Sequence, residues 1–255
     1  MFLSINTAFP GSCSLAVLDH NGQVLSEDSL SQERGHDQVL FTLIESVLTK
    51  ASVSLDDIDH IITTVGPGSF TGIRIGIAAT EGLCVNRRLS NALKNTSGNT
   101  TVPMCAAPEA YGITAFAVLL GAYLETAQKQ HLQMPTWTLL PTQTGAFYGQ
   151  LWTPNGDNTA TPQAPQIIPL EQVTLQLKDP NCHVVLSGST VLADGYTSFE
   201  HTPLARHAGL AMRWNLFTEL TPYYLMDPSF TPQEGLSPKE PLIHSTFSTP
   251  PLFTS

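Results

Sequence analysis

Apolar residues recur with a helical period between His36 and Lys50. Their spacing of i, i+3, i+4 and i+7 places them on one face of a helix. The pattern therefore predicts an amphipathic helix over 36–50. Its apolar face is formed by Val39, Leu40, Leu43, Ile44, Val47 and Leu48.

Short apolar segments on either side of this helix predict strands. The turn His20-Asn21-Gly22 lies between two of them, and Asn-Gly accepts the positive φ of a tight hairpin. A second helix, expected over Ile73–Arg87, is mostly small and aliphatic. The first part of the chain thus reads strand, strand, strand, helix, strand, helix. The four strands are expected at Phe2–Ala8, Cys13–Asp19, Val24–Leu30 and Ile58–Val65.

Strands and helices also alternate in the rest of the chain, where polar loops separate them. This alternation predicts an α/β or α+β protein with two lobes. Loops are expected at Leu89–Val102 and Thr153–Pro165, which are rich in Asn, Thr and other loop-forming residues. The other elements are expected as helices at Glu109–Gln130 and Leu204–Leu220 and as strands at Trp137–Leu140, Ala146–Trp152 and Val184–Leu186.

The loop composition divides the chain into three parts. We expect a first lobe over 1–102 and a second lobe over 103–227, whose last helix and strand can return to the first. Residues 228–255 contain six prolines and many Ser and Thr without an apolar period. This tail is therefore expected to be disordered.

Composition and charge disfavour several classes of protein for this chain. With 255 residues, of which 42% are apolar, the chain can bury a substantial core. Its 11 basic residues are scattered among 21 acidic ones, which disfavours a long basic groove for nucleic acid. The longest uncharged, largely apolar stretch, Ala110–Leu124, is shorter than the roughly 20 residues of a membrane-spanning helix and predicts a buried helix. No secretory signal precedes Arg34, the first basic residue, so we expect a cytoplasmic protein with reduced thiols.

The segment Gly66-Pro67-Gly68-Ser69-Phe70-Thr71-Gly72 joins a strand to a helix and is rich in glycine. Such a turn can present backbone N–H groups to an anion, and the Ser69 hydroxyl can cap the helix. The segment is not a Walker loop, because Ile73 stands where lysine is needed, and its last glycine interval is too long for a dinucleotide fingerprint. An anion site and a purely structural turn both remain open. The anion or nucleotide contacts would be Gly66, Gly68, Ser69, Thr71 and Gly72.

Other candidate chemistry is sparse. No two of the eight histidines lie three or four residues apart, so no helix presents a histidine pair to a metal ion. The serine-hydrolase elbow G-x-S-x-G does not occur. Asp56, Asp57 and Asp59 are expected to face water. We therefore predict no metal site and no catalytic residue.

The stretch Gly66–Gly76, which reads GPGSFTGIRIG, resembles the signature of the bacterial TsaB (YeaZ) family. The opening Ile5-Asn6-Thr7-Ala8 is similar to that of the same family, and His36 to its histidine at the head of the first helix. The resemblance covers the first 85 residues. Beyond them it rests on Phe147-Tyr148 and Pro222-Tyr223-Tyr224-Leu225.

This resemblance implies the actin, Hsp70 and sugar-kinase (ASKHA) fold, with two ribonuclease-H-like lobes and mixed sheets. It implies a non-catalytic partner of TsaD, the transferase that makes N6-threonylcarbamoyladenosine (t6A) in tRNA. Such a partner acts with TsaE and contacts tRNA only as part of the complex. It has no cofactor of its own, although ATP or ADP could bind at the interface shared with TsaD. The older peptidase M22-like (glycoprotease) description of such sequences receives little weight, because metal-ligand histidines are missing.

Members of the family associate through their two N-lobe helices, which correspond here to 36–50 and 73–87. Without TsaD, such a surface could pair two copies of the chain. The second helix is apolar on more than one side, as packing on both a sheet and a partner requires. A wholly buried core helix is the alternative. The partner contacts implied are His36, Leu43, Val47, Phe70, Arg74, Ile75, Ala79 and Leu83.

The chain also departs from the family pattern. Asn6 replaces the opening aspartate, Thr142-Gln143-Thr144 replaces a D-A-R motif, and Met226 replaces the arginine after P-x-Y-L. In kinases of this fold the first acidic residue orients a Mg²⁺-bound water, and a neutral amide cannot supply that charge. These departures favour a binding subunit over an enzyme. The alternative is a stand-alone ATP-dependent phosphotransferase or hydrolase of the same fold, which ATP turnover by the purified chain would reveal.

Overall fold

The computed structural model describes residues 1–31, 36–96, 106–128, 131–142, 144–177, 179, 181–187, 199–201 and 203–225. The chain divides into two compact units. The three-part division at residues 102 and 227 stays a prediction, and the tail 228–255 lies outside the described residues. The first unit contains Met1–Val118 and Leu204–Pro222, and the second contains Leu119–Pro203 and Tyr223–Ser255.

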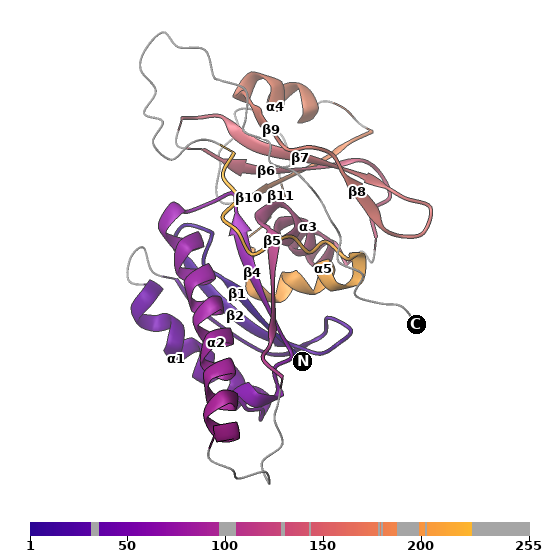
Figure 1. Ribbon diagram of the computed structural model, residues 1–255. Helices are drawn as coiled ribbons and strands as arrows, with labels where there is room; N and C mark the ends of the chain where they lie inside the picture. The colour runs from indigo at the N-terminus through magenta and orange to yellow at the C-terminus, as the bar shows by residue number, and fades with distance from the viewer. Residues whose placement is uncertain are drawn as a thin grey trace. The chain divides into compact units, whose positions relative to one another are not determined.

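The first unit is built on a five-stranded mixed sheet with the strand order β3-β2-β1-β4-β5 (Figure 1). The first three strands form an antiparallel meander, and β4 and β5 run parallel to β1. A parallel strand that follows an antiparallel meander needs a crossover, which α1 supplies between β3 and β4. The strands are β1 (Phe2–Asn6), β2 (Ser12–Leu18), β3 (Val24–Ser31), β4 (His60–Gly66) and β5 (Glu109–Thr114).

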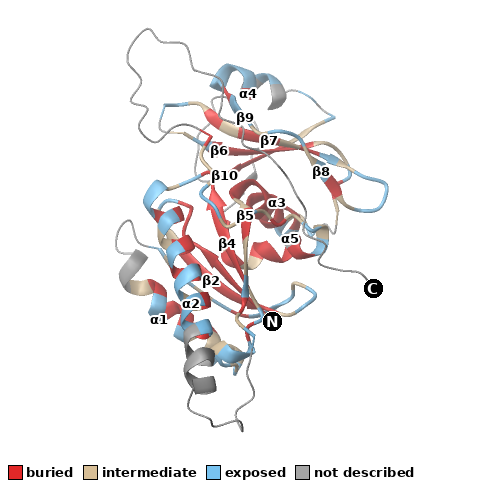
Figure 2. Cartoon of the chain, viewed as in Figure 1, coloured by how far each residue is buried: buried red, intermediate tan, exposed pale blue. Residues whose placement is uncertain are grey.

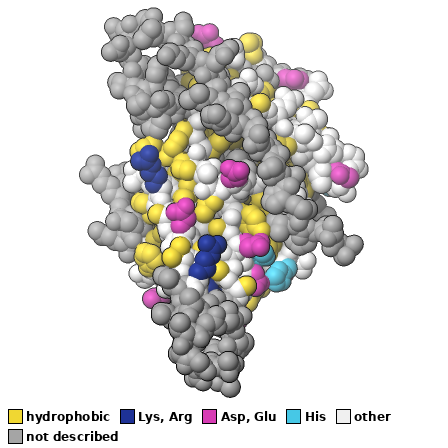
Figure 3. Space-filling view, in the orientation of Figure 1, with side chains coloured by type: hydrophobic (Ala, Val, Ile, Leu, Met, Phe, Trp, Pro, Cys, Tyr) yellow, Lys and Arg dark blue, Asp and Glu magenta, His cyan; other side chains and the backbone are white. Residues whose placement is uncertain are grey.

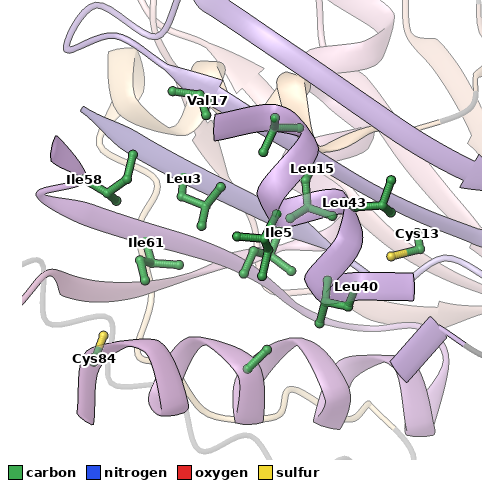
Figure 4. Close-up of a cluster of buried hydrophobic side chains, with 13 residues drawn as sticks. Leu3, Ile5, Cys13, Leu15, Val17, Leu40, Leu43, Ile58, Ile61 and Cys84 are labelled. Atoms are coloured by element: carbon green, nitrogen blue, oxygen red, sulfur yellow. The ribbon is translucent and has the colours of Figure 1, made fainter. Parts of the chain in front are cut away.

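Two helices, α1 (His36–Ala51) and α2 (Phe70–Thr96), cover one face of this sheet. A single cluster of buried side chains from both helices and from β1, β2 and β4 fills the space between them (Figure 4). The apolar face predicted for α1 lies in this cluster, because Leu40, Leu43, Ile44 and Val47 are all buried in it. The outward surfaces of both helices are largely exposed (Figure 2).

The opposite face of the sheet is covered by the returning segment Leu204–Pro222, which contains a short 3-10 helix (Ala205–Ala208) and α5 (Gly209–Trp214). The Ser4 hydroxyl donates to the carbonyl oxygen of Ala205 (2.8 Å), and the Ala205 N–H donates to the Ser14 hydroxyl (2.9 Å). Successive residues of a strand face opposite sides, so these serines lie away from the α1/α2 core. Two buried serines thus satisfy both backbone groups of one residue in the returning segment.

The second unit has a six-stranded mixed sheet in which β11, β10, β6, β7 and β8 follow one another and β9 pairs with β7. Its core is a cluster that includes Trp137, Phe147 and Val173. Helix α3 (Ala115–Thr126) follows β5 directly, and α4 (Leu170–Leu177) follows β9. The strands are β6 (Thr136–Pro141), β7 (Phe147–Pro154), β8 (Ala160–Pro162), β9 (Gln166–Ile168), β10 (His183–Ser187) and β11 (Phe199–His201).

The element order predicted for the first part of the chain is confirmed. The hairpin signal at Asn21-Gly22 is also confirmed, because Gly22 has a φ of 78° and the Asp19 N–H donates to the carbonyl oxygen of Gln23 (2.9 Å). In the second part, the strands that form β6, β7 and β10 were predicted close to their positions, whereas β8, β9, α4 and β11 were not predicted. The end of β7 and the whole of β8 lie within the loop expected at Thr153–Pro165.

Three predicted elements were wrong in extent. Helix α2 continues to Thr96 through the expected loop, because no glycine or proline interrupts it after Gly82. Residues Glu109–Thr114 form strand β5 instead of the start of a helix, so the 15-residue apolar stretch is a strand followed by a helix. The expected helix Leu204–Leu220 ends at Trp214, where Asn215 adopts a φ of 52°. Among the helices that the structure describes, none has the length and hydrophobicity required to traverse a bilayer.

Candidate interaction surface

The glycine-rich loop between β4 and α2 packs its backbone against the end of β1. Gly66 has a φ of 120°, a region that side chains other than glycine rarely adopt. The Ser69 N–H donates to the carbonyl oxygen of Ala8 (2.7 Å). A Cβ atom on Gly72 would lie well under 3.0 Å from the carbonyl oxygen of Thr7. The glycines therefore allow the start of α2 to approach the backbone of residues 7–8 directly.

The first turn of α2 is capped from within the chain. The Ser69 hydroxyl accepts a hydrogen bond from the Gly72 N–H (3.2 Å), as expected for a capping serine. The Ile73 N–H donates to the carbonyl oxygen of Ser69 (2.9 Å), and the Thr7 hydroxyl donates to that of Gly72 (2.7 Å). The amides of Ser69, Gly72 and Ile73 are thus engaged inside the protein. Anion or nucleotide contact at Gly66, Gly68, Ser69, Thr71 and Gly72 stays a prediction, in which the exposed residues Gly68 and Thr71 are the accessible members.

Asn6 is buried and is the last residue of β1. Its side-chain oxygen accepts a hydrogen bond from the Ala8 N–H (3.4 Å), so the amide helps to shape the β1 end on which Gly68 and Gly72 pack. At this position the chain holds a neutral group, which contributes no negative charge to bind a cation.

The outer face of α2 carries hydrophobic side chains with charged side chains among them (Figure 3). Val85 is 49% exposed and Phe70 is 37% exposed. Both are large apolar side chains, which most often lie in the interior. The Arg74 guanidinium lies 3.7 Å from the centre of the Phe70 ring, a cation–π contact that holds both side chains in place. Aromatic and arginine side chains in a pre-organised arrangement are typical of residues that anchor protein interfaces.

The predicted partner contacts separate into two groups. Leu43, Val47 and Ala79 contribute to the hydrophobic core, so their side chains are not on the surface of the first unit. Phe70 and Arg74 are exposed, whereas Ile75 and Leu83 are half-buried. The backbone of His36 begins α1, and its side chain lies outside the described part.

Sequence reasoning missed several exposed residues on the same surface. Ala78 and Val85 lie at the centre of the outer face of α2, and Phe41 of α1 is 59% exposed. A helical projection of residues 70–88 would have found the first two, because they fall opposite the buried residues Gly76 and Arg87. We name the outer face formed by Phe70, Arg74, Ala78, Glu81, Val85 and Arg88 the α2 stripe.

Polar contacts fix α1 to the sheet and α2 to the short 3-10 turn Leu55–Asp57. The Asp28 carboxylate on β3 accepts hydrogen bonds from Lys50 Nζ (2.7 Å) and Ser46 Oγ (2.5 Å) on α1. Arg87 of α2 donates from its two terminal nitrogens to the carbonyl oxygens of Leu55 and Asp56, at 2.6 Å each. The position of the surface helices is thereby set independently of any partner.

The contact between α1 and β3 predicts a dependence of stability on pH. The hydrogen bonds from Lys50 and then from Ser46 hold the pKa of Asp28 below its ordinary value. A lowered pKa in the folded state means that the stabilisation is complete above about pH 4 and is lost as the pH falls further. We expect Asp28→Asn to lower the free energy of unfolding by about 0.5 kcal/mol at pH 7, since both groups are partly exposed.

Urea unfolding of the wild type and of Asp28→Asn from pH 3 to pH 7 tests this expectation. The difference between the two proteins should shrink below about pH 4, where protonation removes the charge of Asp28 in the wild type as well. Glu45→Gln, at an exposed position of α1, serves as a control. A difference that stays constant over the whole range would contradict the assignment.

Other reactive groups in the described residues offer little chemistry. Cys13, Cys84 and Cys182 are free thiols, and burial raises the pKa of each, to about 11 for Cys13 and Cys182. No group of three or more His, Cys, Asp and Glu side chains among them is arranged to hold a metal ion. Thr142 and Thr144 form the turn between β6 and β7, with their hydroxyls 3.0 Å apart. Gln143 and Met226 lie outside the part that the structure describes.

A family model matches the region that contains α1 and most of α2. Residues 23–90 match the family model described as TsaD, tRNA N6-adenosine threonylcarbamoyltransferase. The tRNA threonylcarbamoyladenosine biosynthesis protein TsaB of Escherichia coli is 39% identical over 87 residues, which are 34% of this chain and 36% of that protein. The TsaB of Haemophilus influenzae is 33% identical over 72 residues, 28% and 30% of the two chains. The chain thus matches little more than a third of the length of these relatives.

The likeness of the fold extends further than the likeness of the sequence. YeaZ from Pseudomonas aeruginosa covers 88% of this chain and 99% of its own, with a TM-score of 0.60 and 19% identity. A second Pseudomonas aeruginosa structure, described as similar to peptidase YeaZ, covers 88% and 98% with a TM-score of 0.62 and 20% identity. Together with the two mixed sheets, these neighbours confirm the predicted actin- and sugar-kinase-like fold. The relatives, the fold and the glycine-rich loop with the two helices beside it support the resemblance to the TsaB (YeaZ) family that the sequence predicted.

Proposed function

We propose that this chain takes part in the formation of t6A in tRNA as a binding subunit, which holds and activates the transferase TsaD together with TsaE. The observation that carries the proposal is the α2 stripe, an exposed apolar and cationic surface on a helix fixed to its sheet. Most of this helix lies in the segment that matches the transferase model, residues 23–90. Two proteins that share this segment can present equivalent helices to each other.

The chemistry of the site supports a role in binding. The position of the acidic residue that orients a metal-bound water in kinases of this fold holds the neutral, buried Asn6. The transferase would therefore carry out the reaction, and tRNA would be reached only through the complex. ATP or ADP, if bound, would lie where the exposed part of the glycine-rich loop meets TsaD. The role of this chain is then to stabilise the active form of the transferase, which requires a surface and no catalytic group.

Val85→Glu tests the proposal directly. Val85 belongs to the stripe and is half exposed, so the variant is expected to fold normally. In a complex, the carboxylate would be buried against apolar groups, which we expect to weaken binding of TsaD about 30-fold or more. Isothermal titration calorimetry with the TsaD of the same organism measures the loss, and t6A formation with TsaD, TsaE and tRNA should fall with it.

Leu175→Glu is the matched control. Leu175 is an exposed leucine on α4 of the second unit, so its replacement introduces the same charge on another surface. This variant is expected to bind TsaD and to support modification like the wild type. Equal binding by Val85→Glu and the wild type, with both folded by circular dichroism, would refute the proposed surface.

A further inference from the structure

The inner face of α2, opposite the α2 stripe, rests on the first sheet through glycines and threonines. Gly72, Gly76 and Thr80 recur at intervals of four residues, so they follow one ridge of the helix. A Cβ atom on Gly76 would lie 2.6 Å from the Thr7 hydroxyl oxygen and 3.0 Å from the methyl group of Thr63. The missing side chain thus lets two threonines, Thr7 after β1 and Thr63 on β4, reach the helix directly.

A chain of hydroxyl groups joins α2 to β4. The Thr80 hydroxyl donates to the carbonyl oxygen of Gly76 (3.0 Å), a contact that a threonine in a helix can make with the residue four positions earlier. Because the Thr80 proton is used there, the Thr63 hydroxyl is the donor in the hydrogen bond between Thr63 and Thr80. Both threonines are fully buried. Each of the two hydroxyl protons therefore has an acceptor inside the protein.

This contact fixes the rotation of α2 about its own axis. A hydrogen bond is directional, whereas burial of apolar side chains alone would allow the helix to turn or slide on the sheet. Thr80 follows Ala78 by two positions, which places the two side chains about 200° apart around the helix. As long as Thr80 points to β4, Ala78 and the rest of the α2 stripe face outward.

We infer that Thr80 is a positioning residue for the binding of TsaD, because its hydrogen bond with Thr63 sets the direction in which the α2 stripe faces. The inference rests on the proposed function, since the stripe is the surface that is oriented. Thr80 itself is buried and would touch no partner. Its effect on binding would pass entirely through the helix.

Three variants separate the hydroxyl group from the shape of the side chain. Thr80→Val keeps the volume but leaves the buried Thr63 hydroxyl without its acceptor, which favours a displaced helix. Thr63→Val breaks the same hydrogen bond from the side of the sheet and leaves no donor unpaired, whereas Thr80→Ser keeps the hydroxyl. In calorimetry, both valine variants are expected to bind TsaD at least about fivefold more weakly than the wild type, and Thr80→Ser within about twofold of it.

Two buried cysteines report a movement of α2 without any partner. Cys84 lies one turn after Thr80 on α2, and Cys13 lies on β2, in the same cluster of side chains (Figure 4). Mass spectrometry measures how fast iodoacetamide modifies each thiol. In the valine variants, a displaced helix should raise the rate at Cys84 at least about fivefold more than the rate at Cys13, whereas a general loss of stability should raise both by a similar factor.

Ser14→Ala is the matched control. It removes a buried hydroxyl from the opposite face of the same sheet, where Ser14 accepts a hydrogen bond from the Ala205 N–H (2.9 Å). This variant should be less stable than the wild type, with unchanged TsaD binding and an unchanged ratio of the two cysteine rates.

Three results would overturn the inference. They are wild-type binding of TsaD by the valine variants, equal rises of the rate at Cys84 and Cys13, and a Thr80→Ser variant that behaves like Thr80→Val. Failure of the proposed function would be seen elsewhere, as TsaD binding that Val85→Glu leaves unchanged. The two failures are therefore distinguishable.

Discussion

Gly72→Ala is expected to lower the free energy of unfolding by about 3 kcal/mol or to prevent folding. The added Cβ would meet the carbonyl oxygen of Thr7 and the side chain of Ser69, and the nearest of these atoms is backbone. Neither the end of β1 nor the start of α2 can move freely, because the Thr7 hydroxyl and the Gly72 carbonyl oxygen are hydrogen-bonded to each other (2.7 Å). Overpacking against a backbone that cannot yield is among the most destabilising single changes.

Gly82→Ala, in the same helix, is the control for this prediction. A Cβ on Gly82 meets no atom within 4 Å, so the change should leave stability unchanged or raise it by up to about 1 kcal/mol. Urea unfolding of both variants measures the contrast. Comparable stability of the two variants would show that the loop does not need the close approach seen here.

Arg87→Met is expected to lower the free energy of unfolding by about 2 to 3 kcal/mol. Only 6% of Arg87 is exposed, and its guanidinium donates to two carbonyl oxygens and forms an ion pair with Asp56 (3.1 Å). A methionine would fill much of the space but would remove the guanidinium donor from both carbonyl oxygens, so that the Leu55 oxygen would keep only the Ile58 N–H. Loss of two hydrogen bonds from a charged group is costly. The turn of residues 55–57 should loosen first.

Hydrogen exchange gives a local measurement of this effect. The amides of Asp57 and Ile58 close the short turn by donating to Ser54 and Leu55, and they should exchange faster in Arg87→Met. Arg88→Met changes the exposed neighbour and should leave both amides protected. A global loss of stability without faster exchange at these two amides would assign Arg87 a different role.

Local signals predicted the first sheet and its helices well. The helical period of 36–50 and the hairpin at Asn21-Gly22 reflect interactions between residues close in the sequence, which a single sequence displays directly. The start of α2 was readable for the same reason, because Ser69 caps it. Strand β5 was missed because an apolar strand runs into an apolar helix without a glycine or proline between them. One signal was present, since the Thr114 hydroxyl accepts a hydrogen bond from the Ala117 N–H (3.2 Å) and caps α3.

Which helix residues are buried, and where residues 204–222 pack, depends on contacts between residues far apart in the sequence. Leu43 and Ala79 were predicted to contact a partner and lie in the core, whereas Ala78, the residue before Ala79, is exposed. A difference of one position rotates a side chain by about 100° around the helix, and only the direction of the sheet settles which position faces outward. The return of residues 204–222 likewise depends on Ser4 and Ser14, some 190 residues earlier, and no local pattern encodes such a pairing.

That return sets the order of events during synthesis. The sheet of the first unit keeps one face uncovered until residues near 222 have left the ribosome, because the segment that covers it begins about 90 residues after the last strand of the sheet. At about 5–20 residues per second, the stretch of about 110 residues from the end of β5 to Pro222 would take roughly 5 to 22 s to be made. Throughout that interval α1 and α2 are already available on the other face. The helices that offer the interaction surface can therefore be in place before the domain that carries them is complete.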